Sequence, residues 1–429
     1  MKRVLILLGL WFSAGFVLSC GSSSSSSGGA IAKRAFVTQD ISSGISFAGV
    51  LTIDAENDVL GLVAPLSAGS QPGMMVVTPN RSGTLVFSAQ ENLLTLINNS
   101  TGSSESSVAL PGFTKSFVVA PDTITGYAAV PGAPVSGQPP GVVKAFNLAS
   151  GAFTTEIDIP AATYLAMSHN GSRLLALSTG IDSVANRVAV ITLNGAGNPT
   201  VTLVPGFDHP IAAFFSSDDT IAYVVNCGIE CGGTRASVQQ LNMTGNSLGV
   251  QTGVCTPGAS PVCAASTALV SGTTMYLAGT PYNPDGTPAQ PCTGQATAAP
   301  SCGLLTVLDL PTMTVTKSGI VITDGFHDRM AMGANGQLFV GANDCTEISL
   351  GSGNAEIRGC LSIYNTQTGA VVIPPANGDV TGIQPISGRL VVYVVQGGEL
   401  QIYDTTTDKL QTTQINLTGE AVDVKSIDF

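Results

Sequence analysis

One apolar pattern recurs eight times along this chain of 429 residues. Each repeat contains an apolar strand, a tight turn, a second apolar strand, a loop, a third strand, another turn and a fourth strand. The second strands begin at Ala35, Thr84, Gly126, Leu174, Ala222, Met275, Leu338 and Leu390. The third strands end at Asp54, Asn98, Asn147, Leu193, Asn242, Asp309, Asn365 and Asp404. Both series indicate eight repeats, which favours one repetitive domain over the two or three that length alone suggests.

The spacing of the repeats predicts a β-propeller. Residues 35–429 divided by eight give about 49 residues per repeat, close to the repeats of known propellers. A four-stranded sheet cannot bury both of its faces alone, whereas a ring of such sheets buries them and leaves only short edges. We therefore expect an all-β propeller with eight four-stranded blades, with seven as the alternative. The first repeat lacks a first strand, and we expect residues 422–427 to supply it and close the ring.

Four segments carry a family resemblance. They are AFVTQD at 35–40, VLTIDAENDVL at 50–60, QPGMMVVTPNRSGTLVFSA at 71–89 and SHNGSRLLAL at 168–177. These repeats resemble the YVTN-repeat β-propellers of bacterial envelopes, many of which have seven blades. Enzymes and binding proteins share this architecture, so the resemblance implies a fold and no particular activity.

The N-terminal region resembles the start of a bacterial lipoprotein. Lys2 and Arg3 precede an apolar run from Val4 to Leu18, and the following Ser19-Cys20 completes a motif similar to a lipobox. An ordinary signal peptide or a membrane helix is the alternative, although the run is shorter than the ~20 residues of a membrane span. We expect 1–19 to be a signal peptide, 20–34 to be the lipidated Cys20 with a Ser/Gly-rich linker, and 35–429 to be the propeller.

This N-terminus predicts where the protein resides. Several acyl chains on Cys20 would anchor the chain stably at the cell envelope without a membrane span. Gly21 after the lipidated cysteine is typical of sorting to the outer membrane, on the periplasmic face or the cell surface. We expect the membrane contact to be made by the lipid alone.

Charge excludes one class of partner. Without Lys2 and Arg3, 14 of the 16 basic side chains remain against 28 acidic ones, a formal net charge of −14. The basic residues form no cluster, whereas nucleic-acid binding needs concentrated Lys and Arg. We therefore expect no nucleic-acid partner, and we expect the propeller to be a monomer.

Eight cysteines besides Cys20 predict disulfide bonds in an exported protein. Sequence neighbours suggest four pairs, although eight cysteines allow 105 pairings. All four pairs would lie in connections that emerge on one face of a propeller, over repeats five to seven. Rigidly held loops are frequent sites of binding. Disulfides that only protect long loops from proteolysis would explain the same cysteine pattern. The suggested pairs are Cys227 with Cys231, Cys255 with Cys263, Cys292 with Cys302, and Cys345 with Cys360.

Polar residues at the start of the inner strands are the candidates for a metal site. Two histidines occupy the same repeat position, in GFDHP at 206–210 and in GFHDR at 325–329. A ring of imidazoles and carboxylates at the mouth of the central channel could hold a divalent ion that activates water. Solvated polar ends of strands explain the same residues, because no diagnostic ligand spacing is present. The candidates are Asp208, His209, His327, Asp328, Asp379 and Glu420.

No sequence motif identifies a catalytic residue. The only tryptophan, Trp11, lies in the signal peptide, so the mature chain does not resemble quinoprotein dehydrogenases or sialidases. A Gly-x-Ser-x-Gly elbow and a phosphate-binding loop are absent as well. We expect a lipid-anchored, non-enzymatic binding or scaffold module whose disulfide-pinned face holds an envelope protein or a small molecule. The alternative is a metal-dependent hydrolase, similar to propeller lactonases, with its site at the channel mouth.

Overall fold

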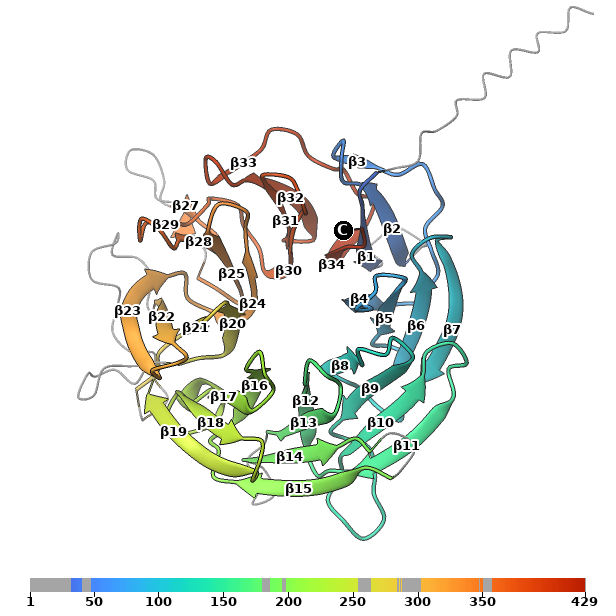
Figure 1. Cartoon of the computed structure of the whole chain (residues 1–429). Helices are drawn as coiled ribbons and strands as arrows, with labels where there is room; N and C mark the ends of the chain where they lie inside the picture. Colours follow the sequence, from blue (N-terminus) through green and yellow to red (C-terminus); the bar gives the residue numbers. More distant parts are fainter. Residues whose placement is uncertain are drawn as a thin grey trace, which may run out of the picture. The chain divides into compact units, whose positions relative to one another are not determined.

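The structure, a computed structural model, describes residues 32–40, 48–179, 186–194, 198–253, 264–283, 285, 287, 302–346, 348–349 and 357–428. In the unit that starts at Ala32, eight four-stranded antiparallel sheets follow one another around a ring (Figure 1). This confirms the eight-bladed propeller and excludes the seven-bladed alternative. The blades are numbered here in chain order from the N-terminus.

The strands of the first four blades follow the predicted repeats. Blade 1 contains β34 (Glu420–Ser426), β1 (Arg34–Asp40), β2 (Gly49–Asp54) and β3 (Val59–Leu60); blade 2 contains β4 (Pro72–Val77), β5 (Gly83–Ser88), β6 (Leu93–Asn98) and β7 (Ser103–Ala109). Blade 3 contains β8 (Ser116–Val119), β9 (Thr125–Val130), β10 (Val142–Asn147) and β11 (Phe153–Asp158); blade 4 contains β12 (Ala162–Met167), β13 (Arg173–Ser178), β14 (Arg187–Thr192) and β15 (Thr200–Pro205).

The last four blades repeat this order and carry two additional elements. Blade 5 contains β16 (Pro210–Phe215), β17 (Ile221–Asn226), β18 (Ser237–Asn242) and β19 (Ser247–Gly253); blade 6 contains β20 (Thr267–Ser271), β21 (Thr274–Gly279), β22 (Gly303–Asp309) and β23 (Thr314–Ile322). Blade 7 contains β24 (Phe326–Met332), β25 (Gln337–Asn343), β28 (Leu361–Asn365) and β29 (Val371–Val372); blade 8 contains β30 (Val380–Pro385), β31 (Val391–Gln396), β32 (Glu399–Asp404) and β33 (Lys409–Leu410). The 3₁₀ turn η1 (Ile229–Cys231) follows β17, and the hairpin of β26 (Ile348–Ser349) and β27 (Ile357–Arg358) follows β25.

The hydrophobic core lies between neighbouring blades. Successive residues of a second strand point to opposite faces of the sheet, so Val86 of β5 packs towards blade 1 while Leu85 and Phe87 pack towards blade 3. In the described residues there are eight such clusters, one at each interface between blades. Because every cluster needs two blades, the ring is stable only when it is closed.

Both ends of the chain close the ring, as predicted. The C-terminal strand β34 is the innermost strand of blade 1 and pairs antiparallel with β1, from Ala35 opposite Ser426 to Asp40 opposite Glu420. The buried carboxylate of Asp423 accepts a hydrogen bond from the Met75 backbone N–H of blade 2 at 2.9 Å and another from Lys425 at 2.8 Å. Blade 1 is thereby joined to blade 2 by a polar contact as well as by apolar packing.

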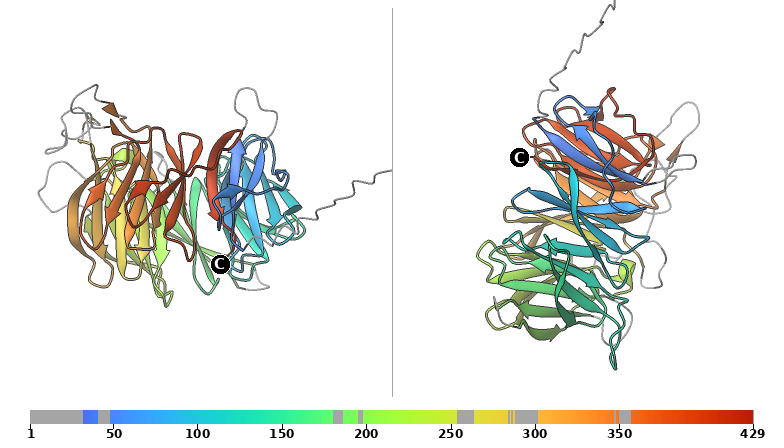
Figure 2. Two further views of the ribbon diagram at one scale, coloured as in Figure 1. Left: turned by 90° about the horizontal axis from the view of Figure 1, so that it is seen from above. Right: turned by 90° about the vertical axis from the view of Figure 1, so that its right-hand side faces the viewer.

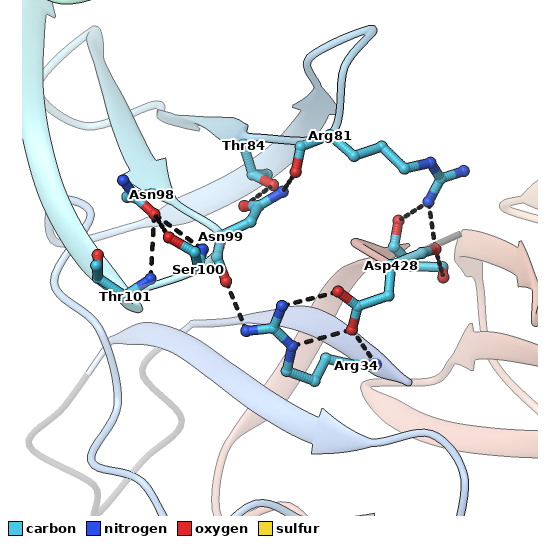
Figure 3. A network of polar contacts seen from close by, with 9 residues as sticks. Arg34, Arg81, Thr84, Asn98, Asn99, Ser100, Thr101 and Asp428 are labelled. Atoms are coloured by element: carbon cyan, nitrogen blue, oxygen red, sulfur yellow. Dashed lines mark hydrogen bonds and ion pairs between the residues drawn. The ribbon is translucent and has the colours of Figure 1, made fainter. Parts of the chain in front are cut away.

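A second polar network strengthens this closure (Figure 3). The Arg34 guanidinium donates hydrogen bonds to both carboxylate oxygens of Asp428, at 2.9 and 2.7 Å, and to the Asn99 carbonyl at 2.6 Å. Arg81 of blade 2 donates to the carbonyls of Ser426 and Asp428. We call this network the closing clasp. It ties the start of β1 and the end of β34 to blade 2.

The antiparallel order gives the ring two different faces. The turn face carries the connections from first to second and from third to fourth strands, and the closing clasp lies on it. The loop face carries the connections from second to third strands and from each blade to the next. The side view in Figure 2 shows the strands running between these faces and the C-terminus at one of them.

Candidate functional site

Disulfide bonds hold two connections of the loop face. Cys227 is bonded to Cys231 in blade 5, with Cα atoms 5.8 Å apart, and Cys345 to Cys360 in blade 7, with Cα atoms 5.4 Å apart. These two predicted pairs are confirmed. Cys302 is also disulfide-bonded, while its expected partner and the expected pair Cys255–Cys263 lie outside the described residues.

Two of the predicted metal ligands anchor these disulfide-bonded loops. Asp208 accepts hydrogen bonds from the backbone N–H groups of Thr234 and Arg235, both at 2.8 Å, and from the Thr234 hydroxyl at 2.7 Å. Burial works to raise the pKa of Asp208, but these hydrogen bonds outweigh it and hold the pKa below its ordinary value. In blade 7, Asp379 accepts a hydrogen bond from the Asp344 N–H at 2.7 Å, beside the Cys345–Cys360 disulfide.

The two predicted histidine ligands are buried in different interfaces. His209 has its Nδ1 3.7 Å from Asp208 Oδ1. His327 is fully buried and donates a hydrogen bond from Nε2 to the Thr323 carbonyl at 3.0 Å. Burial lowers the pKa of His327 to about 4, against a smaller opposite effect of the Thr323 carbonyl. Its ring is therefore neutral at physiological pH.

The six predicted ligands do not form one group. Within the residues that the structure describes, no three His, Cys, Asp or Glu side chains are placed to hold a metal ion. Glu420 is exposed at the start of β34, and only Asp328 lines the cavity described below. The shared repeat position put these residues on one face, but each blade uses its residue for its own loop or interface.

A cavity of about 420 Å³ lies at the mouth of the central channel on the loop face. Blades 2 to 7 all contribute to it, mainly through the first residues of their inner strands. Three of its aromatic side chains are Phe87, Phe113 and Phe326, and the latter two are 50% and 39% exposed. Its full lining is Gly73, Met74, Phe87, Ala89, Phe113, Thr114, Lys115, Tyr164, Ile211, Ala212, Ser266, Thr267, Ala268, Phe326, Asp328 and Arg329. We call this cavity the channel pocket.

Charged groups of blades 3 and 7 lie in the wall of the channel pocket. Arg329 donates from Nη1 to the Asp328 carboxylate at 3.0 Å and from Nε to the Thr381 carbonyl at 2.6 Å. Burial raises the pKa of Asp328 above its ordinary value, partly opposed by the positive charge of Arg329. The pKa of Tyr164 is raised by burial and then by the negative charge of Asp328, which lines the same cavity. Lys115 on blade 3 is exposed.

A buried carboxyl group also supports the loop face beside the pocket. Glu230, in η1 within the Cys227–Cys231 loop, accepts a hydrogen bond from the Thr280 N–H of blade 6 at 3.2 Å. Burial raises the pKa of Glu230 to about 8, opposed by that hydrogen bond. Glu230 therefore docks the loop of one blade onto the next in its protonated form.

Sequence reasoning missed most of the channel pocket. Asp328 was predicted as a metal ligand, whereas Phe113, Lys115, Tyr164 and Phe326 were not singled out. Phe113 and Lys115 carry a weak signal, since they lie within three residues before the inner strand β8, as His209 directly precedes β16. Glu230 carried no signal beyond its place between two paired cysteines.

Comparisons of the sequence with known proteins find no relative. No protein-family model matches the chain. No curated protein matches it either. Among the described residues there is no helix with the length and apolar character needed to cross a membrane.

Solved structures with the same fold share little sequence with the chain. A functionally unknown protein from Desulfotomaculum acetoxidans is 16% identical over 79% of this chain and 94% of its own, with a TM-score of 0.51. Dihydro-heme d1 dehydrogenase NirN is 11% identical over 92% of this chain and 75% of its own, with a TM-score of 0.60. A putative 6-phosphogluconolactonase from Bacteroides uniformis is 14% identical over 92% of this chain and 99% of its own, with a TM-score of 0.48. The two likenesses with TM-scores above 0.5 show the fold alone and carry no activity over to this chain.

Proposed function

We propose that this propeller is a non-enzymatic binding module of the bacterial envelope that holds its ligand on the loop face. The observation that carries the proposal is the channel pocket, with two half-exposed phenylalanine rings at its mouth. Its volume falls within the roughly 300–1,000 Å³ typical of ligand sites. Exposed aromatic rings gathered in a concave site favour binding, because covering them removes apolar surface from water.

The rigidity of the loop face supports the proposal. Disulfides close loops in blades 5 and 7, and the carboxylates of Asp208 and Asp379 hold the backbone of those loops. A site that is already ordered loses little conformational entropy when it binds its ligand. Both carboxylates hold loop backbone in these contacts.

The lipid anchor at Cys20 belongs to the same proposal. The described chain begins at Ala32, beside Arg34 of the closing clasp on the turn face. A lipid on Cys20 would attach the protein to the membrane without a membrane span. Labelling cells with an alkyne fatty acid should mark the wild type and leave the Cys20→Ala variant unlabelled.

Two substitutions at the pocket mouth test the binding role. The full mature protein is purified from its native membranes as wild type, as Phe113→Ser/Phe326→Ser, and as the control Phe153→Ser. Phe153 is 44% exposed on the outer strand of blade 3, away from the channel. Mass spectrometry of co-purified molecules should find a species carried by wild type and control and lost from the double variant. If the double variant retains everything that the wild type carries, the binding role of the pocket is wrong.

The metal-dependent hydrolase remains a prediction without a specific observation in its favour. The described residues place no three candidate ligands together. The YVTN-repeat membership likewise stays a proposal, based on the four segments named above.

A further inference from the structure

We infer that the channel pocket selects an amphipathic anion, a molecule with an apolar ring body and a carboxylate or similar acidic group. This inference rests on the proposed function and specifies the ligand class for the same site. Three features of the pocket carry it: its aromatic wall, the charges around it, and its size.

The aromatic wall fits a ring-shaped, apolar body. The rings of Phe87 and Phe113 are paired edge to face, with centroids 5.7 Å apart and an interplanar angle of 68°. This contact fixes the orientation of Phe113 although half of its surface is exposed. A fixed, exposed ring presents a face or edge on which a planar ligand can stack without first ordering the side chain.

The charges around the pocket favour an anion. Arg329 and Asp328 are paired with each other, so their formal charges offset. Lys115 is exposed and makes no hydrogen bond or ion pair with the residues that the structure describes. Among the residues that line the pocket, the formal charges of Lys115, Arg329 and Asp328 sum to +1, in a chain whose formal net charge is −12. The Asp379 carboxylate, whose charge acts on Asp328, lies outside this lining. An acidic group on the ligand would gain a charge-assisted contact at Lys115, and the pocket would disfavour a cation.

The pocket's size selects a small molecule. Its volume of about 420 Å³ suits a body of two or three rings. Lys115 and Arg329 come from blades 3 and 7, which stand on opposite sides of the eight-bladed ring. The lysine contact is therefore at one side of the pocket, and a ligand held there extends over the aromatic wall towards Asp328 and Arg329.

Two fluorescent probes with the same ring body separate the contribution of charge from that of apolar contact. The probes are 1-anilinonaphthalene-8-sulfonate, an anion, and N-phenyl-1-naphthylamine, which is neutral. With the mature wild-type protein at low salt, we expect the anionic probe to bind about tenfold more tightly, the effect of one charge-assisted contact. Added salt should reduce the affinity of the anionic probe and leave that of the neutral probe nearly unchanged.

Lysine substitutions assign the charge effect to the pocket. Lys115→Met should lower the affinity of the anionic probe about tenfold and leave the affinity of the neutral probe unchanged. The control Lys409→Met removes an exposed lysine from the outer strand β33 and should change neither affinity. Phe113→Ser should weaken both probes, because both use the aromatic wall. Equal thermal unfolding midpoints would show that the exposed Lys115 and Lys409 variants fold like the wild type.

The outcomes distinguish this inference from the proposed function. Equal binding of both probes, weakened by Phe113→Ser but unaffected by Lys115→Met, overturns the anion preference and leaves the pocket as a binding site. Failure of both probes to bind, or binding that Phe113→Ser leaves unchanged, overturns the pocket as a site for aromatic ligands and the function proposed from it. If Lys115→Met weakens the affinity of the anionic probe tenfold and leaves the neutral probe unchanged, both the anion preference and the proposed function are supported.

Discussion

The two faces of the ring satisfy the polar groups at strand ends in different ways. On the turn face a side chain usually bonds the backbone two or three residues further on, as Asn98 does with the N–H groups of Ser100 and Thr101. On the loop face the partners are far apart in sequence: Asp208 binds Thr234, and Asp379 binds Asp344. Local turn chemistry therefore builds most of the turn face, where the closing clasp and the pairing of Arg389 with Asp58 are long-range exceptions. Long-range contacts hold the loops of the loop face.

The difference bears on the binding site that we propose on the loop face. Removing an ionisable group from water disfavours its charged form. On the loop face, burial raises the pKa of Glu230 and Asp328 and lowers that of His327. Groups of this kind cluster at functional sites more often than elsewhere. The short turns of the turn face use their polar side chains to hold their own backbone, as Asn98 does.

The largest expected effect concerns acid sensitivity on the loop face. The pKa of His327 in the folded protein is about 4, below the ordinary 6.5. As pH falls below 6.5, His327 becomes protonated in the unfolded chain but stays neutral in the folded protein. The free energy of unfolding therefore falls by about 3 kcal/mol by pH 4. His327→Asn should remove most of this slope, as measured by urea unfolding between pH 4 and 8.

A histidine of the turn face is the matched control for this prediction. His169 lies in the turn after β12 and bonds Asp219 with a largely exposed side chain. His169→Asn, measured over the same pH range, is the control for replacing a histidine by asparagine. An unchanged slope in the His327 variant would contradict the assignment.

The next effect concerns the closing clasp. Arg34→Met removes two charge-assisted hydrogen bonds to Asp428 in a partly buried setting, and should lower the free energy of unfolding by about 2 kcal/mol. The control is Lys33→Met, which breaks the 3.8 Å pair with the half-exposed Glu56 and should cost less than about 0.5 kcal/mol. Chemical denaturation at one pH measures both. A clasp variant as stable as the control would show that strand pairing alone closes the ring.

The smallest effect concerns a single turn. Asn98→Ala removes the acceptor for the Ser100 and Thr101 N–H groups, at 2.8 and 3.1 Å, and should cost about 1 kcal/mol or less because water can replace it. The Asn98 amide also donates to the Glu105 carboxylate, so the control Asn98→Asp is made in a Glu105→Gln background, where it keeps the acceptor and should stay within about 0.5 kcal/mol of Glu105→Gln alone. Thermal unfolding compares the two. A loss from Asn98→Ala as large as that from Arg34→Met would contradict the local character of the turn face.

Much of the fold followed from patterns that are local in the chain. The second strands around Leu85, Val224 and Val340 were found from runs of apolar residues, which are buried on both faces between blades. The shortest strands, such as β3 and β33, have two residues each and carry no comparable pattern. The Cys227–Cys231 pairing was also predictable, because the two residues are close in sequence.

The site was only partly predictable. The positions of Asp208, His209 and Asp379 on one face followed from the repeat, but their partners did not. Asp208 acts on Thr234, a residue of a loop with no repeat counterpart. The predicted metal site depended on the assumption that residues at equal repeat positions point to a common centre. The loop and interface contacts that these side chains make could not be predicted from the repeat.

The sequence by itself determined the number of blades and the strand that closes the ring, because strand length, alternation and repeat spacing depend on neighbours in the chain. Only the tertiary structure decided what lies at the channel mouth. Phe113, Tyr164 and Arg329 belong to three different blades and share one cavity only after the ring has closed. Their burial and charge depend on residues from other blades, so the ligand class that we propose for this pocket could not be inferred from the sequence alone.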